Sequence, residues 1–178
     1  TTMTTNRKTL NPDVVMERLV KIAPEMIDTI VKPGPHCVLA TTIGQMTLAR
    51  FGIVADPYPV EVTICNAAWL NWIAEDCPGG RDEQLRRGAY VLSNTPNFKG
   101  GSFQTVKVDK PWDGHLVLRV PSRKPLLIDL DLGSFRRPQH DIRLPGGVVA
   151  PLTRGELHGT FVDESGTETA VQYKPLLP

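Results

Sequence analysis

The chain has 178 residues, of which 40% are hydrophobic and 22% charged, and its formal charge at pH 7 is +1. This length suits one domain that buries roughly two-thirds of the surface its unfolded chain exposes. The balanced charge, without a concentrated basic stripe, argues against a nucleic-acid or anionic-membrane partner. Three cysteines, Cys37, Cys65 and Cys77, are too few and too scattered for a disulfide framework.

The cellular location is predicted from the apolar stretches, the N-terminal segment and the number of cysteines. The longest apolar stretches are far shorter than the roughly 20 residues of a membrane-spanning helix. The polar opening TTMTTNRK has no signal-peptide core, and an odd cysteine count suits a reducing compartment. We therefore expect a cytoplasmic protein with a disordered tail over residues 1–10 and a single domain over residues 11–178.

The first predicted helix begins at Asn11 and Pro12, a typical cap and first helical residue. Pro24 is expected to kink this helix or divide it into two. Apolar residues recur at helical spacing through the segment, at Val15, Leu19, Ile22, Met26 and Ile30.

A second helix is predicted after the break at KPGPH, from Cys37 to about Phe51. Gly52 is in the right place to end it. An apolar stripe runs along it through Leu39, Ile43 and Met46.

Strands dominate the remaining sequence. Alternation in VEVTIC predicts a half-buried strand, and the tract 66–99 combines short helices, loops and the start of a strand at AYVLSN. GHLVLRV and PLLIDLDL, joined by the turn-like PSRK, predict an antiparallel hairpin. ESGTE supplies a turn for a final strand pair. Helices followed by antiparallel strands indicate an α+β fold.

One cysteine, one histidine and one aspartate suggest catalytic chemistry. The thiolate is the nucleophilic form of cysteine, and an imidazole or a helix N-terminus favours that form. Cys37 stands where the second helix begins, and His115 opens the first strand of the hairpin. An imidazole that acts as a base needs an acceptor to hold its tautomer.

The hairpin itself provides that acceptor. If its turn centres on Arg123, paired residue numbers sum to about 245 or 246, so residue 115 lies opposite about residue 130. Asp129 and Asp131 then flank His115 on one face of their strand, because side chains alternate along a strand. We expect Asp129 to be the orienting carboxylate, with Asp131 as the alternative.

Simpler interpretations exist for each residue. A single helical cysteine or strand histidine is commonly structural, and acidic strand residues commonly face solvent. A metal site of His115, Asp129 and Asp131 would be a thin ligand set. His36 is not expected to act beside Cys37, because adjacent residues at a helix start point apart. The other expectations are surface positions for His140 and His158, and incidental or buried thiols for Cys65 and Cys77.

The three motifs together resemble the transglutaminase-like branch of the papain-like cysteine enzymes. HCVLATTIGQMTLARFGIVADPYPVEV resembles the family's nucleophile helix and the strand after it, WDGHLVLRV its histidine strand, and LLIDLDLGSF its aspartate strand. The resemblance covers roughly residues 34–138. It implies N-terminal helices packed on an antiparallel sheet or partial barrel, with Cys37 as nucleophile, His115 as base and Asp129 as orienting carboxylate.

Two differences between this sequence and members of the superfamily restrict the activities that we expect. The chain is too short for the frame of the calcium-dependent transglutaminases and lacks the Arg-Gly-Gly of the arylamine N-acetyltransferases. We therefore expect a cysteine hydrolase, a peptidase or amidase, that forms a thioester with a peptide, amide or ester substrate. The alternatives are an acyltransferase of the same fold and a catalytically silent binding module. No cofactor and no metal are expected.

The oxyanion of such a reaction needs hydrogen-bond donors. The backbone N–H of Cys37 is expected to be one of them. For the second, the sequence suggests Asn66, Gln45 or Trp112 without choosing among them.

Overall fold

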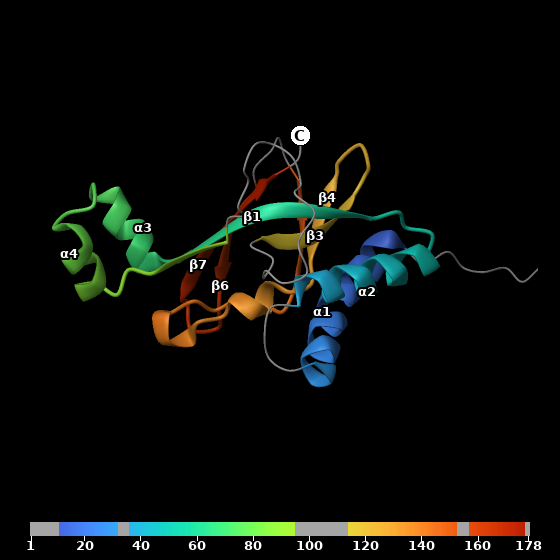
Figure 1. The fold of residues 1–178 in the computed structure, drawn as a ribbon, viewed down its shortest axis with the longest axis horizontal. Helices are drawn as coiled ribbons and strands as arrows, with labels where there is room; N and C mark the ends of the chain where they lie inside the picture. Colours follow the sequence, from blue (N-terminus) through green and yellow to red (C-terminus); the bar gives the residue numbers. More distant parts are fainter. Residues whose placement is uncertain (1–10, 32–35, 95–113, 153–156, 177–178) are drawn as a thin grey trace, which may run out of the picture.

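The computed structural model describes residues 11–31, 36–94, 114–152 and 157–176 (Figure 1). The expected tail over residues 1–10 and the candidate Trp112 lie outside the described residues, as does the side chain of His158. Within the described residues, two N-terminal helices pack on a curled antiparallel sheet that forms a half-barrel. The α+β prediction is confirmed. No described helix is both long and apolar enough to cross a membrane.

Helix α1 spans Pro12–Ile30. The Asn11 side chain caps it by accepting a hydrogen bond from the Asp13 N–H at 3.0 Å. Pro24 does not divide the helix, which is one of the two expected outcomes; the helix is continuous through this residue, which is buried inside it. The predicted apolar face is only half right, because Val15 and Leu19 are buried whereas Ile22, Met26 and Ile30 are more than half exposed.

Helix α2 spans Cys37–Arg50 and ends as predicted, with Gly52 in the left-handed conformation at φ 74°. Its predicted apolar stripe does not form the buried face, since Leu39, Ile43 and Met46 are all exposed. The face toward the sheet carries small side chains instead. A Cβ on Gly44 would lie 2.6 Å from Leu130 and 2.7 Å from Leu118. The missing side chain therefore permits the close approach of α2 to the sheet.

The described strands form one sheet in which every pairing is antiparallel. The spatial order is β5-β4-β3-β1-β7-β6, and β2 also pairs with β1. The strands are β1 (Asp56–Asn66), β2 (Val91–Asn94), β3 (His115–Val120), β4 (Leu126–Asp129), β5 (Val148–Pro151), β6 (Leu157–Val162) and β7 (Glu168–Pro175). The two predicted hairpins are thus β3–β4 and β6–β7.

The long strand β1 connects the parts of the sheet. Along one edge, residues 56–60 pair with β3 and residues 62–65 pair with β2, while the other edge pairs with β7. Helices α1 and α2 pack on the part of the sheet that β3, β4 and β5 form, near the N-terminal end of β1 (Figure 1). Helices α3 (Ala67–Ala74) and α4 (Gly80–Arg86) lie at the opposite end of β1.

Side chains alternate across the sheet and create two cores. In β3, Leu118 joins the core under the helices, whereas Val117 joins the core on the other face. In β4, Ile128 and Leu127 divide in the same way. By this alternation, the odd-numbered residues His115 and Asp129 belong to the face opposite the helices. The core on that face is closed by two short 3₁₀ helices, η1 (Leu132–Phe135) and η2 (Pro138–His140), and by the segment after them.

Candidate active site

His115 is the first residue of β3, and only 1% of its surface is exposed. Its Nε2 atom lies 2.8 Å from Oδ2 of Asp129. The ring also makes an edge-to-face contact with Phe135 of η1, with ring centroids 5.0 Å apart and an interplanar angle of 78°. The imidazole is therefore held on one edge by a carboxylate and on another side by an aromatic ring.

Asp129 ends β4, and its side chain is fully buried. The β3–β4 register pairs Leu118 with Ile128, so paired numbers sum to 246, which agrees with the sequence-based estimate. Besides His115, the Tyr173 hydroxyl donates to Oδ2 at 2.7 Å and the Asp131 N–H donates to Oδ1 at 2.8 Å. A buried carboxylate is costly without such partners, and here both oxygens are satisfied.

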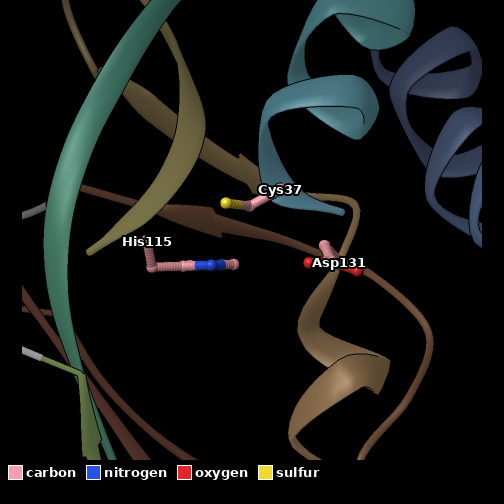
Figure 2. A group of neighbouring side chains, drawn as sticks. All are labelled: Cys37, His115 and Asp131. Carbon is pink, nitrogen blue, oxygen red and sulfur yellow. The ribbon is translucent and has the colours of Figure 1, made fainter. Parts of the chain in front are cut away.

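Cys37 is the first residue of α2 and is 6% exposed. Its Sγ, a ring nitrogen of His115 and a carboxylate oxygen of Asp131 all lie within 4.8 Å of one another. Figure 2 shows the three side chains converging from the start of α2, the start of β3 and the segment between β4 and η1. The first N–H groups of a helix have no partner within the helix, so they can bind an anion near the sulfur.

The protonation of His115 reflects competing effects. Burial disfavours the imidazolium and would lower its pKa. The charge and hydrogen bond of Asp129, supported by Cys37, outweigh burial and raise the pKa of His115 to about 10. The carboxylate of Asp129 therefore favours the cationic form of the ring.

Asp131 is a second acid at the same place. It is 8% exposed, and its Oδ2 accepts a hydrogen bond from the backbone N–H of His36 at 2.9 Å. This bond ties the residue before Cys37 to the segment that follows β4. Burial raises the pKa of the Asp131 carboxyl to about 6, and the charge of Asp129 acts in the same direction. The His36 N–H acts in the opposite direction, because it stabilises the carboxylate.

Asp129 and Asp131 occupy different positions around the His115 ring. Asp129 contacts Nε2 of His115, while Asp131 lies close to both His115 and the sulfur of Cys37. Sequence reasoning did not identify Tyr173, which lies on β7 and is buried, with a pKa raised well above its ordinary value by burial and by Asp129. Its position follows from the pairing of β7 with β1, which local patterns do not reveal.

Two candidates for the second oxyanion donor have structural tasks elsewhere. The Gln45 amide donates to the Ala55 carbonyl at 2.9 Å. The Asn66 side chain caps α3 and also bonds backbone groups of Gly88, Tyr90 and His140. Both N–H groups of the Asn66 amide are therefore engaged in backbone contacts, and the Gln45 amide uses one of its two N–H groups. The third candidate, Trp112, lies outside the described residues.

His140, Cys65 and Cys77 differ in their environments. His140, expected on the surface, is half-buried and stacks on Tyr90 with ring centroids 3.8 Å apart. Cys65 is buried, and burial raises the pKa of its thiol, whereas Cys77 is exposed. Within the part of the chain that the structure describes, neither cysteine belongs to a cluster of metal-binding or catalytic side chains.

A buried cysteine, histidine and aspartate arranged in this way are compatible with a cysteine-nucleophile catalytic triad. A scan against models of protein families finds no match for the chain. Searches of the curated proteins and of the solved structures also find no significant match.

Proposed function

We propose that the protein is a cysteine hydrolase, a peptidase or amidase of transglutaminase-like type, that acts through Cys37, His115 and Asp129. The observation that carries the proposal is that one imidazole both contacts the Asp129 carboxylate and lies close to the Cys37 thiol. Asp129 occupies Nε2 at 2.8 Å, and the thiol of Cys37 lies within 4.8 Å of a ring nitrogen. A nucleophile, a base and a group that orients the base are the parts that such catalysis requires.

The order of elements supports the same interpretation. The cysteine begins a helix, the histidine begins a strand and the aspartate ends the neighbouring strand. The transglutaminase-like enzymes, which the sequence resembles, place their triad on elements in this order. The half-barrel behind two N-terminal helices is also the architecture that this resemblance implies.

The proposed reaction has two steps. The Cys37 thiolate forms a bond to the carbonyl carbon of an amide or ester, and the carbonyl electrons move onto oxygen, where the Cys37 N–H at the start of α2 stabilises them. Collapse breaks the bond to the leaving group, which takes a proton from His115. Water then gives a proton back to His115 and adds to the thioester carbonyl, and cleavage of the C–S bond releases the acid and restores the Cys37 thiolate. Asp129 holds the ring throughout.

Thiol reactivity tests the first requirement. We expect iodoacetamide to modify Cys37 of the reduced, chelator-treated protein well below pH 8, and His115→Ala to abolish this reactivity. Because His115→Ala leaves a buried gap, His115→Gln is the parallel variant, and circular dichroism verifies that both fold. Cys65→Ala is the matched control, since Cys65 is buried and does not belong to the Cys37–His115–Asp131 group. Modification of Cys37 only above pH 8, or equally in the His115 variants, would contradict the proposal.

Acyl-enzyme formation tests the chemistry. With p-nitrophenyl acetate, we expect release of p-nitrophenolate and an acetyl group on Cys37, detected by mass spectrometry of the peptide and absent in Cys37→Ser. Decay of the adduct in water supports a hydrolase, whereas decay only after an amine is added indicates the acyltransferase alternative. A protein whose Cys37 never acquires the acetyl group is a binding module rather than an enzyme.

A further inference from the structure

One buried acid near the nucleophile, Asp131, has no role in the proposed reaction. A cysteine, a histidine and one carboxylate complete the triad, and Asp129 already orients the imidazole. Asp131 is nevertheless 8% exposed, and one of its oxygens lies within 4.8 Å of both the Cys37 sulfur and a ring nitrogen of His115. A negative charge beside a sulfur that must become negative opposes the reaction. The position of Asp131 therefore calls for another explanation.

We propose that Cys37, His115 and Asp131 form a binding site for a divalent transition-metal ion, with Zn²⁺ as the fitting ion, and that its occupation blocks the thiol. The three donors are sulfur, nitrogen and oxygen, the ligand types that zinc accepts. Bonds of about 2.0–2.3 Å to a tetrahedral ion place its ligand atoms roughly 3.3–3.8 Å apart. Donor atoms already within 4.8 Å of one another need only small side-chain rotations to close around the ion.

The surroundings of the ligands support this assignment. Zinc-bound histidines commonly donate their other ring N–H to a carboxylate, which fixes the ring and raises its basicity. Asp129 is such a carboxylate, at 2.8 Å from Nε2, and Tyr173 and the Asp131 N–H hold it in turn. The His36 N–H holds Oδ2 of Asp131 at 2.9 Å, so this ligand is also oriented.

The charges balance when the ion is bound. Zn²⁺ binding displaces two protons, the thiol proton of Cys37 and one ring proton of the His115 imidazolium, and both leave to solvent. The thiolate and the Asp131 carboxylate then neutralise the two positive charges of the ion. The neutral imidazole binds through the lone pair of the nitrogen that does not face Asp129. Three protein ligands leave the fourth position of a tetrahedral ion for water. Loss of the free sulfur and of the free imidazole nitrogen stops acyl transfer, and this consequence alone rests on the proposed function.

Cobalt spectroscopy tests the site directly. The full chain is reduced, freed of metal with a chelator, exchanged into chelator-free buffer and titrated with Co²⁺ without oxygen. We expect one Co²⁺ per chain, with a near-ultraviolet thiolate-to-cobalt band and the visible bands of a four-coordinate ion, both removed by one equivalent of Zn²⁺. Cys37→Ser, a nearly isosteric change that preserves the fold, should abolish the near-ultraviolet band, and Cys65→Ala should retain it.

Substitutions of Asp129 and Asp131 should raise the dissociation constant for Co²⁺ by different factors. Loss of an outer-shell partner typically costs 10–100-fold in metal affinity, so Asp129→Asn should weaken binding by about that factor. Asp131→Asn removes a ligand and should weaken binding by more than Asp129→Asn. The absence of a thiolate band in the wild type, its survival in Cys37→Ser, or unchanged affinity in a folded Asp131→Asn variant overturns the metal site.

Alkylation separates this inference from the proposed function. Zn²⁺ should slow the reaction of Cys37 with iodoacetamide, excess chelator should restore it, and the exposed Cys77 should react equally in both conditions. A reactive Cys37 without a cobalt band refutes the metal site and leaves the hydrolase intact. A cobalt band with an unreactive Cys37 in the metal-free protein refutes the hydrolase and leaves the metal site intact.

Discussion

Two groups of charged side chains lie at different places along β1, one beside the middle of the strand and the other beyond its C-terminal end, and they have opposite environments. Beside the middle of β1, where Val60 pairs with His115, the side chains of His115 and Asp129 form an ion pair and are 2% and 0% exposed. At the far end, on α3 and α4, Glu83 binds Arg86 and Arg87, and Arg87 also binds Glu75 at 2.6 Å. The Arg86 side chain is 73% exposed. The geometry of the ion pairs is similar, but water surrounds only the second group.

This difference in solvent access determines what each group contributes. An exposed ion pair is screened by water and salt and exchanges partners at little cost. A buried ion pair is costly to form, and the loss of one partner leaves an uncompensated charge in the interior. The buried pair is therefore the one whose chemistry and stability are sensitive to single substitutions.

Removal of the buried carboxylate should have the largest effect. Asp129→Ala leaves His115 and the Tyr173 hydroxyl buried without their partner, so we expect a loss of about 3–5 kcal/mol in the free energy of unfolding. Urea denaturation followed by circular dichroism measures this loss. Glu83→Ala is the control from the exposed group. Equal losses for the two variants would contradict the distinction between the two groups.

Raising the pH should reduce the contribution of the His115–Asp129 ion pair to the free energy of unfolding. The pKa of His115 is raised from 6.5 to about 10, so its stabilisation is complete below pH 6.5 and disappears as the pH rises through 10. In chelator-containing buffer, the stability difference between wild type and His115→Gln should therefore be largest near pH 6 and shrink by a few kcal/mol, on the order expected from linkage, toward pH 10. A difference that is constant over this range would refute the assignment.

Removal of one hydrogen bond to the buried carboxylate should have an intermediate effect. Tyr173→Phe keeps the ring and deletes the hydroxyl that donates to Asp129 at 2.7 Å. We expect a loss of about 1.5–3 kcal/mol, the usual range for a hydrogen bond to a charged group. The double variant Tyr173→Phe with Asp129→Ala should lose less than the sum of the two single losses, because both changes remove the same contact.

The smallest effect should come from the exposed group. Glu83 accepts hydrogen bonds from Arg86 and Arg87, which lower its pKa to about 2. Its stabilisation is present above the ordinary pKa of a glutamate and is lost as the pH falls through about 2. At neutral pH, Glu83→Gln should lower the thermal midpoint only slightly, and 1 M salt should remove the difference between the variants. A large decrease in the thermal midpoint that 1 M salt does not remove would show that Glu83 contributes as much as the buried His115–Asp129 pair.

Local patterns in the sequence were sufficient where a residue acts on its neighbours along the chain. Asn11 caps α1, Gly52 ends α2 and PSRK closes the β3–β4 hairpin, because each of these depends on a few adjacent residues. The hairpin register, in turn, placed Asp129 near His115. The same patterns misjudged α2, since its exposed stripe is more apolar than the small-residue face that packs on the sheet.

The amino-acid sequence by itself determined the α+β class, the start of a helix at Cys37 and the pairing that brings His115 to Asp129. These features follow from helix signals and from the two-residue period of strands, which operate over short stretches of chain. Only the tertiary structure decided that α2 approaches the sheet closely at Gly44, that Tyr173 reaches Asp129 from β7, and that Asp131 lies beside the sulfur. Those contacts join segments far apart in the chain, and packing rather than local propensity selects them.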